Sequence, residues 1–127
     1  KAGQPLFTIK QGNKTITFNS PASGKVSQIN TLLKENIDAL DVTPYERNWV
    51  CALDAENLDS EIKEMSIGKS AVSFFQEDIE KFKTLFTEIL KSEKKGEEYL
   101  EEGLFIGQLE KLSDVNWNKI VAEFFVR

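Results

Sequence analysis

The sequence predicts an α+β fold in which a β-rich half, residues 1–66, precedes a C-terminal helical extension, residues 67–127. From residue 1 to about residue 54, short runs of alternating apolar and polar residues are separated by glycine, proline and asparagine, as expected for short strands and turns. Beyond this point the spacing of the apolar residues changes from two toward 3.6, the period of an amphipathic helix. This change of period predicts strands followed by helices.

The composition restricts the possible functions. The chain has 127 residues, 40% of them hydrophobic and 29% charged, which suits one soluble globular domain with a modest extension. Its net charge of −5 does not favour nucleic acid as a partner. With no histidine and one cysteine, the chain cannot assemble a Ser-His-Asp triad, a Cys-His pair or the usual zinc sites. We therefore predict a protein that is not catalytic by itself.

The sequence also indicates a cellular location. No apolar run approaches the ~20 residues of a membrane span, and no signal peptide is visible in the given residues. A single cysteine permits no internal disulfide, which fits a reducing compartment. We expect a cytoplasmic protein that does not bind membranes.

A β-hairpin with a lysine beside its turn is predicted near the start of the chain. Two alternating runs, residues 6–10 and 15–19, flank Gly12 and Asn13, a pair that favours a tight two-residue turn. Lys14 follows the turn directly. The expected inward face of the second strand carries Ile16, Phe18, Ser20 and Ala22.

Two helices are predicted in the second half. Residues 68–91 place apolar side chains at helical spacing, opposite a charged face. Ser113 is positioned to cap a final helix. The apolar stripe of this last helix consists of Trp117, Ile120, Val121, Phe124 and Phe125. These stripes must cover each other, the sheet or another chain.

Two further groups of residues have alternative interpretations. Residues 49–53 form an apolar run suited to a strand buried on both faces, so Cys51 is interpreted as an inert apolar residue rather than a redox thiol. Glutamates cluster at positions 97, 98, 101 and 102, where a metal site is conceivable. A solvated acidic loop is favoured, because the spacing does not follow that of a calcium loop.

The first 54 residues resemble a known family. They read KAGQPLFTIKQGNKTITFNSPASGKVSQINTLLKENIDALDVTPYERNWVCALD. This text is similar, without a gap, to the second half of the glycine cleavage system H protein, which has the lipoyl and biotinyl carrier fold. The shared residues are Gly3, Pro5, Ser20, Pro21, Ser23, Gly24, Val26, Asn30, Leu33, Asn36, Pro44, Tyr45 and Trp49. The tail from about residue 67 resembles, more by pattern than by identity, the extended H-protein-like sequences of anaerobic bacteria.

The resemblance implies a barrel-sandwich hybrid in which a lysine at a hairpin tip carries lipoate between partner enzymes. In the ungapped alignment Asn13 occupies the position of the lipoyl lysine, and Lys14 lies one residue too late. A slip of one residue would turn every side chain of the strand to the opposite face. The alignment therefore favours loss of the lipoyl site, with Lys14 as the minority candidate.

Three functions follow from these observations. The preferred one is an H-protein relative without bound cofactor that acts as a docking or regulatory module toward lipoate-using or related enzymes. The alternatives are a working carrier with lipoate on Lys14, in glycine cleavage or a related one-carbon or redox pathway, and a structural protein that oligomerises through its helices. Because a half carrier fold would expose unpaired strand edges, we also expect residues upstream of Lys1 or a second chain to complete it.

Overall fold

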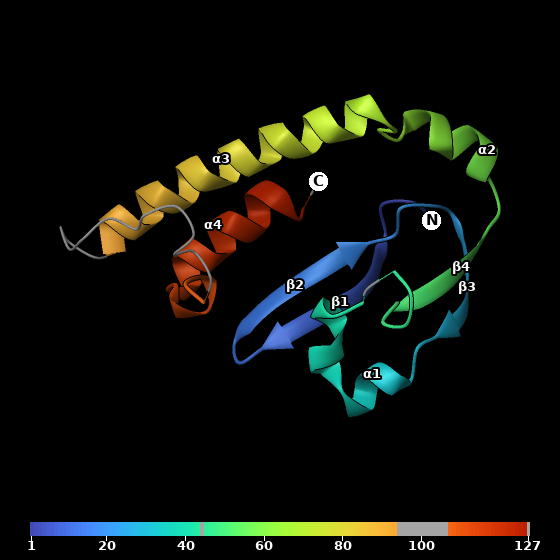
Figure 1. Cartoon of the computed structure of the whole chain (residues 1–127), viewed down its shortest axis with the longest axis horizontal. Helices are drawn as coiled ribbons and strands as arrows, with labels where there is room; N and C mark the ends of the chain where they lie inside the picture. Colours follow the sequence, from blue (N-terminus) through green and yellow to red (C-terminus); the bar gives the residue numbers. More distant parts are fainter. Residues whose placement is uncertain (44, 94–106, 127) are drawn as a thin grey trace. The chain divides into compact units, whose positions relative to one another are not determined.

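The computed structural model describes residues 1–43, 45–93 and 107–126 (Figure 1). Its strands and helices follow in the order β1 (Pro5–Gln11), β2 (Lys14–Asn19), β3 (Gly24–Ile29), α1 (Leu32–Glu35), η1 (Ile37–Asp41), β4 (Cys51–Ala55), α2 (Leu58–Glu61), η2 (Ile62–Glu64), α3 (Lys69–Glu93), η3 (Leu109–Lys111) and α4 (Asp114–Phe124). Two small two-stranded sheets accompany these helices. The predicted α+β class is confirmed.

The chain forms two compact units. The strand unit contains residues 1–4 and 19–65, and the helical unit contains residues 5–18 and the described residues from 66 onward. The hairpin at residues 5–18 thus belongs with the C-terminal helices. The domain boundary between residues 66 and 67, which the sequence favours, stays a prediction.

The hairpin of the helical unit has the predicted tight turn. Gly12, at φ 60°, adopts the left-handed conformation that side chains disfavour. Phe7 stacks on Phe18 across the two strands, with ring centroids 4.8 Å apart. Phe7 and Phe18 are equally distant from the turn, as expected when Gly12 and Asn13 form a two-residue connection.

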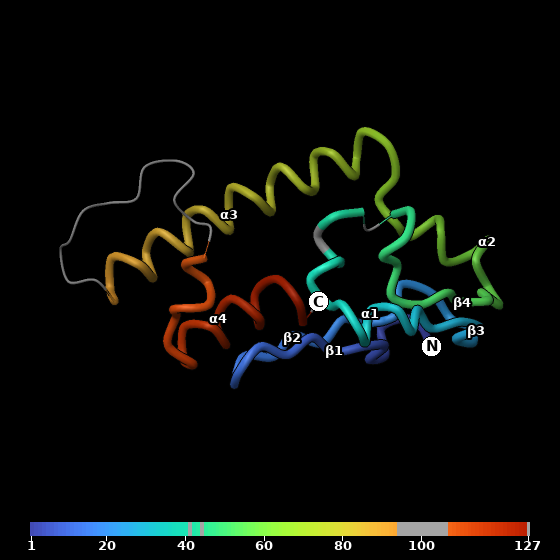
Figure 2. Tube along the Cα trace, turned by 60° about the horizontal axis from the view of Figure 1, so that its bottom comes forward, coloured from blue at the N-terminus to red at the C-terminus, as the bar shows by residue number. Residues whose placement is uncertain are grey.

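The core of the helical unit lies between α3 and α4, which run side by side in both views (Figure 1; Figure 2). Its buried residues are Phe86, Ile89, Leu90, Leu112 and Ile120. The predicted long helix is confirmed, and it extends to residue 93. The first half of its apolar stripe is exposed, however, and Phe75 retains 63% of its accessible surface. The reason is length, since the 11-residue α4 cannot cover the 25-residue α3.

In the strand unit, β3 pairs antiparallel with β4, and the register shifts between Val26 and Gln28. Gly24 lies so close to β4 that a Cβ atom would overlap the carbonyl oxygen of Asp54. Only glycine fits at this approach without a backbone shift. The apolar run at residues 49–53 was expected to be buried on both faces, but Cys51 is only partly buried. Pairing with β3 covers one edge of β4, whereas its two faces would need further packed layers to be buried.

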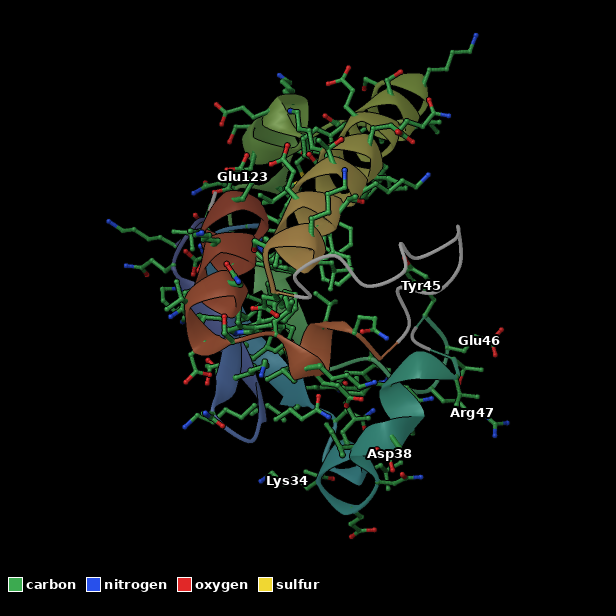
Figure 3. The ribbon with its side chains drawn as sticks, turned by 90° about the vertical axis from the view of Figure 1, so that its left-hand side faces the viewer. Lys34, Asp38, Tyr45, Glu46, Arg47 and Glu123 are labelled. Carbon is green, nitrogen blue, oxygen red and sulfur yellow. The ribbon has the colours of Figure 1, made fainter. Side chains whose placement is uncertain are left out.

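Buried Asn30 holds the segment between β3 and β4 in place. Its Nδ2 donates hydrogen bonds of 2.9 Å to the carbonyl oxygens of Arg47 and Trp49, and its Oδ1 accepts one of 3.2 Å from the amide of Leu32. This segment contains the short helices α1 and η1. Tyr45 is 99% exposed on the following loop, where Glu46 and Arg47 point outward (Figure 3).

Candidate functional site: the hairpin turn

The turn between β1 and β2 carries the two residues singled out by the sequence. Asn13 is exposed at the tip of the turn, and Lys14 begins β2. The side-chain amide of Asn13 donates hydrogen bonds of 3.3 Å to both carboxylate oxygens of Asp114, the first residue of α4. In both cartoon views the turn lies beside the start of α4 (Figure 1; Figure 2). The hairpin turn is therefore in direct contact with the C-terminal helix.

Lys14 is partly buried, although it directly follows the exposed turn. Two positions before Ile16 on the same strand, it lies on the inward face of the hairpin. It lines a pocket of about 200 Å³ whose other walls are Ile9, Gln11, Ile16, Leu109, Glu110 and Trp117. Residues of η3 and α4 supply one side of this pocket, and this accounts for the reduced exposure of Lys14.

Helix α4 and its C-cap residue, Phe125, also contact the hairpin at two points further from the turn. The indole Nε1 of Trp117 donates a hydrogen bond of 3.3 Å to the carbonyl oxygen of Thr15. The ring of Phe125 meets that of Phe18 edge to face, with centroids 5.7 Å apart. The inward face predicted for this strand is confirmed at Phe18, which packs against the helices.

Beside this contact lies an apolar cavity of about 270 Å³. Its walls come from β2, α3, η3 and α4, and they consist of Ile16, Phe75, Asp78, Ile79, Phe82, Leu109, Trp117, Ile120, Phe124 and Phe125. It shares Ile16, Leu109 and Trp117 with the pocket that contains Lys14. The aromatic residues of the final helix thus line a cavity as well as a core.

A polar network at Glu93 fixes the start of α4. One carboxylate oxygen of Glu93 accepts hydrogen bonds from the Asn116 side chain at 2.6 Å, the Ser113 hydroxyl at 2.7 Å and the Ser113 amide at 3.1 Å. The Asn116 and Ser113 side chains lower the pKa of Glu93, and the charge of Lys14 adds to this shift. The predicted cap is confirmed, since the Ser113 hydroxyl accepts from the Asn116 amide. The charged form of Glu93 is therefore the one that the network favours.

Sequence reasoning identified Asn13 and Lys14 but not the residues that contact them. Asp114 and Trp117 lie about a hundred positions away along the chain. No local pattern relates such distant segments, although the apolar stripe of α4 indicated that this helix would cover something. The contact is a product of tertiary packing.

The other candidate sites are less informative. The glutamates at positions 97, 98, 101 and 102 lie outside the described residues. Within the described ranges, no group of three or more histidine, cysteine, aspartate or glutamate side chains could hold a metal ion. No helix in the described part of the chain is both long and apolar enough to cross a membrane.

The fold and the site together define a small α+β protein in which a β-hairpin packs with the C-terminal helices in one unit. The family model described as glycine cleavage H-protein matches residues 1–78, well over half of the chain. The chain belongs to the glycine cleavage H-protein family. The match confirms the resemblance seen in the first 54 residues and extends it into α3.

Curated relatives agree with this assignment. The mitochondrial glycine cleavage system H protein of Mesembryanthemum crystallinum is 29% identical over 77 residues, which cover 61% of this chain and 47% of that protein. A probable glycine cleavage system H protein of Thermococcus gammatolerans is 33% identical over 74 residues, or 58% of this chain and 54% of the relative. The corresponding protein of Thermococcus kodakarensis reaches 39% over 63 residues, which are 50% and 46% of the two chains.

The chain spans about half the length of the curated relatives that it matches. No solved structure matches the chain significantly.

Proposed function

We propose that this protein is an H-protein relative that binds partner proteins without carrying lipoate. The position aligned with the family's lipoyl lysine is Asn13, whose amide side chain lacks the amine that lipoate attachment requires. The observation that carries the proposal is the orientation of Lys14. This lysine lies on the inward face of the hairpin beside Trp117 and Glu110, and not at the protruding tip.

In this proposal neither residue of the turn carries lipoate. A swinging arm needs an exposed attachment point from which it can reach the active site of another protein. Lys14 is partly covered by η3 and α4, and Asn13 is exposed but carries the wrong functional group. In this proposal the protein is not catalytic, and its activity is recognition.

The partners follow from the family. H proteins work with the lipoate-dependent enzymes of glycine cleavage, so a relative that keeps the fold and loses the arm would retain a surface that such enzymes recognise. We propose docking or regulation of these or related enzymes as the function, in the cytoplasm. The exposed loop with Tyr45, Glu46 and Arg47 offers a recognition surface in the strand unit (Figure 3).

The deciding experiment is the intact mass of the protein isolated from its own host, with peptide mapping of residues 5–25. We expect no lipoyl increment under conditions that fully modify a control H protein. A lipoyl group on Lys14 would overturn the proposal and make the protein a working carrier. The variant Asn13→Lys is the matched test of register, because it should be a better acceptor than the native chain for a lipoyl-attaching enzyme.

A second experiment separates docking from a purely structural role. Size-exclusion chromatography with light scattering gives the oligomeric state, and affinity capture with purified lipoate-dependent enzymes tests for partners. We expect a complex with at least one of these enzymes. Stable self-association without any such complex would instead favour an oligomerising module.

A further inference from the structure

The described residues from 107 onward, which we call the C-terminal cover, contact the hairpin at the end of β1, at the turn and along β2. Hydrogen bonds and a ring contact join four pairs of described residues here, each pair consisting of one hairpin residue and one residue of the cover. The pairs are Gln11 with Glu110, Asn13 with Asp114, Thr15 with Trp117, and Phe18 with Phe125. Both strands and the turn between them are engaged.

The cover uses largely different residues for the hairpin and for α3, and Leu109, which lines the Lys14 pocket and packs against the core, belongs to both contacts. Leu112 and Ile120, which are 3% and 2% exposed, belong to the core formed with α3. Trp117 and Phe125 instead contact β2. Contact with the hairpin can therefore be lost while the core between α3 and α4 remains.

The polar contacts between cover and hairpin are individually weak. Their lengths are 3.3 Å at Asn13 and Trp117 and 3.5 Å at Gln11, at the long end of hydrogen-bond geometry, and those of Asn13 and Gln11 are exposed to solvent. Exposed bonds of this kind contribute little, since water competes for both partners. The contact combines one aromatic pair, four long hydrogen bonds and the apolar side chains of Ile16 and Leu109, and its polar part is suited to reversible opening.

We propose that the C-terminal cover is an autoinhibitory segment that closes the hairpin turn and opens to let a protein partner reach it. This inference rests on the proposed function, in which the hairpin belongs to a docking surface. In the closed form Asp114 engages Asn13 at the tip, and Trp117 and Glu110 stand beside Lys14. A partner that binds the turn must displace these residues. Its apparent affinity is therefore the affinity for the open form multiplied by the fraction of molecules that are open.

Chemical labelling of two lysines in one hairpin tests the closure directly. Lys10 lies on the exposed face of β1, and Lys14 lies on the inward face of β2, so Lys10 is an internal reference. The full chain is treated briefly with acetic anhydride, and the rate at each lysine is read by peptide mass spectrometry. We expect Lys14 to react several-fold more slowly than Lys10.

The opening variant is Trp117→Ala with Phe125→Ala, and Val115→Ala on the exposed side of α4 is the control. Loss of both aromatic contacts should raise the Lys14 to Lys10 ratio several-fold, toward the value of one expected for two equally accessible lysines. Val115, 69% exposed, should leave the ratio unchanged. An unchanged ratio in the opening variant, with its helix content retained by circular dichroism, would overturn the proposal.

If the double variant loses its fold, a milder variant tests whether the cover protects Lys14. Trp117→Phe removes the indole N–H that reaches Thr15 and keeps an aromatic ring in place. A higher Lys14 to Lys10 ratio in this variant supports closure by the cover, and an unchanged ratio contradicts it. Neither readout uses lipoate or a partner enzyme. A lipoylated Lys14 in the natural protein would therefore overturn the proposed function. The labelling experiment tests closure by the cover separately.

Discussion

Trp117 of α4 donates a hydrogen bond of 3.3 Å from its indole nitrogen to the carbonyl oxygen of Thr15, 102 residues earlier in the chain. This bond joins the C-terminal helix to the strand that begins at Lys14. It places the hairpin against a helix that lies beyond residues 1–78, the part of the chain that matches the family. The solvent exposure of Lys14 thus depends on a segment that is remote in the sequence.

The bond of Trp117 should contribute measurably to stability. Trp117→Phe removes the N–H donor and leaves the carbonyl of Thr15 without this partner, so we expect a loss of about 1 kcal/mol in the free energy of unfolding. Urea unfolding followed by circular dichroism at 222 nm measures the change. The control Val115→Ala, at an exposed position on the same helix, should stay within about 0.5 kcal/mol of the native protein. Equal stability of Trp117→Phe and the control would contradict the role of the bond.

Buried Asn30 should be important for the strand unit. Asn30→Ala removes both donors to the carbonyl oxygens of Arg47 and Trp49, so we expect a loss of about 1–3 kcal/mol. Trp49 reports on this unit by fluorescence once Trp117 is replaced by Phe. Urea titration in that background gives the free energy. The neighbouring exposed residue Gln28 is the control, and a Gln28→Ala loss as large as that of Asn30→Ala would show that the buried bonds are unimportant.

Phe86 should dominate the core of the helical unit. Its side chain is 0% exposed, so Phe86→Ala leaves a cavity and should lower the free energy of unfolding by about 3–5 kcal/mol. Trp117 fluorescence in a Trp49→Phe background follows this unit. Phe75→Ala, on the same helix and 63% exposed, should cost far less. Similar losses for the two variants would show that the core lies elsewhere.

Acid should weaken the attachment of α4 through Glu93. The hydrogen bonds from Asn116 and Ser113 lower the pKa of Glu93 in the folded protein below its ordinary value of 4.5. A lowered folded pKa means that this stabilisation is complete above pH 4.5 and is lost as the pH falls through the folded pKa. Glu93→Gln should therefore be less stable than the native protein at pH 7, and the difference should shrink in acid.

Urea unfolding at pH 7 and at stepwise lower pH measures this difference. Glu88→Gln, which removes an exposed carboxylate from the same helix, controls for the change in net charge. A Glu93→Gln profile parallel to that of the native protein would mean that the network does not respond to protonation.

Local pattern was sufficient for the individual elements of the structure. The Gly12–Asn13 pair predicted the tight turn because both residues tolerate positive φ, and the apolar period predicted α3 to within two residues at its C-terminal end. Ser113 predicted the start of α4 because a serine hydroxyl accepts from the exposed amides of a helix N-terminus. Each of these depends on neighbours in sequence.

Burial was less predictable than secondary structure. Cys51 lies in an apolar run and was expected to be buried, but its strand has one paired neighbour and remains partly exposed. Phe75 belongs to a regular apolar stripe, yet α4 does not reach far enough along α3 to cover it. A pattern identifies which face is apolar, and packing partners decide how much of that face is hidden.

The sequence by itself determined the family, the hairpin, the two principal helices and the presence of Asn13 at the turn. Only the tertiary structure decided that α4 covers the hairpin and that Lys14 lies partly buried beside Trp117. The physical reason is that an amphipathic stripe specifies that apolar area must leave water but does not specify the surface that receives it. That choice depends on the fit of all the faces of the folded chain at once.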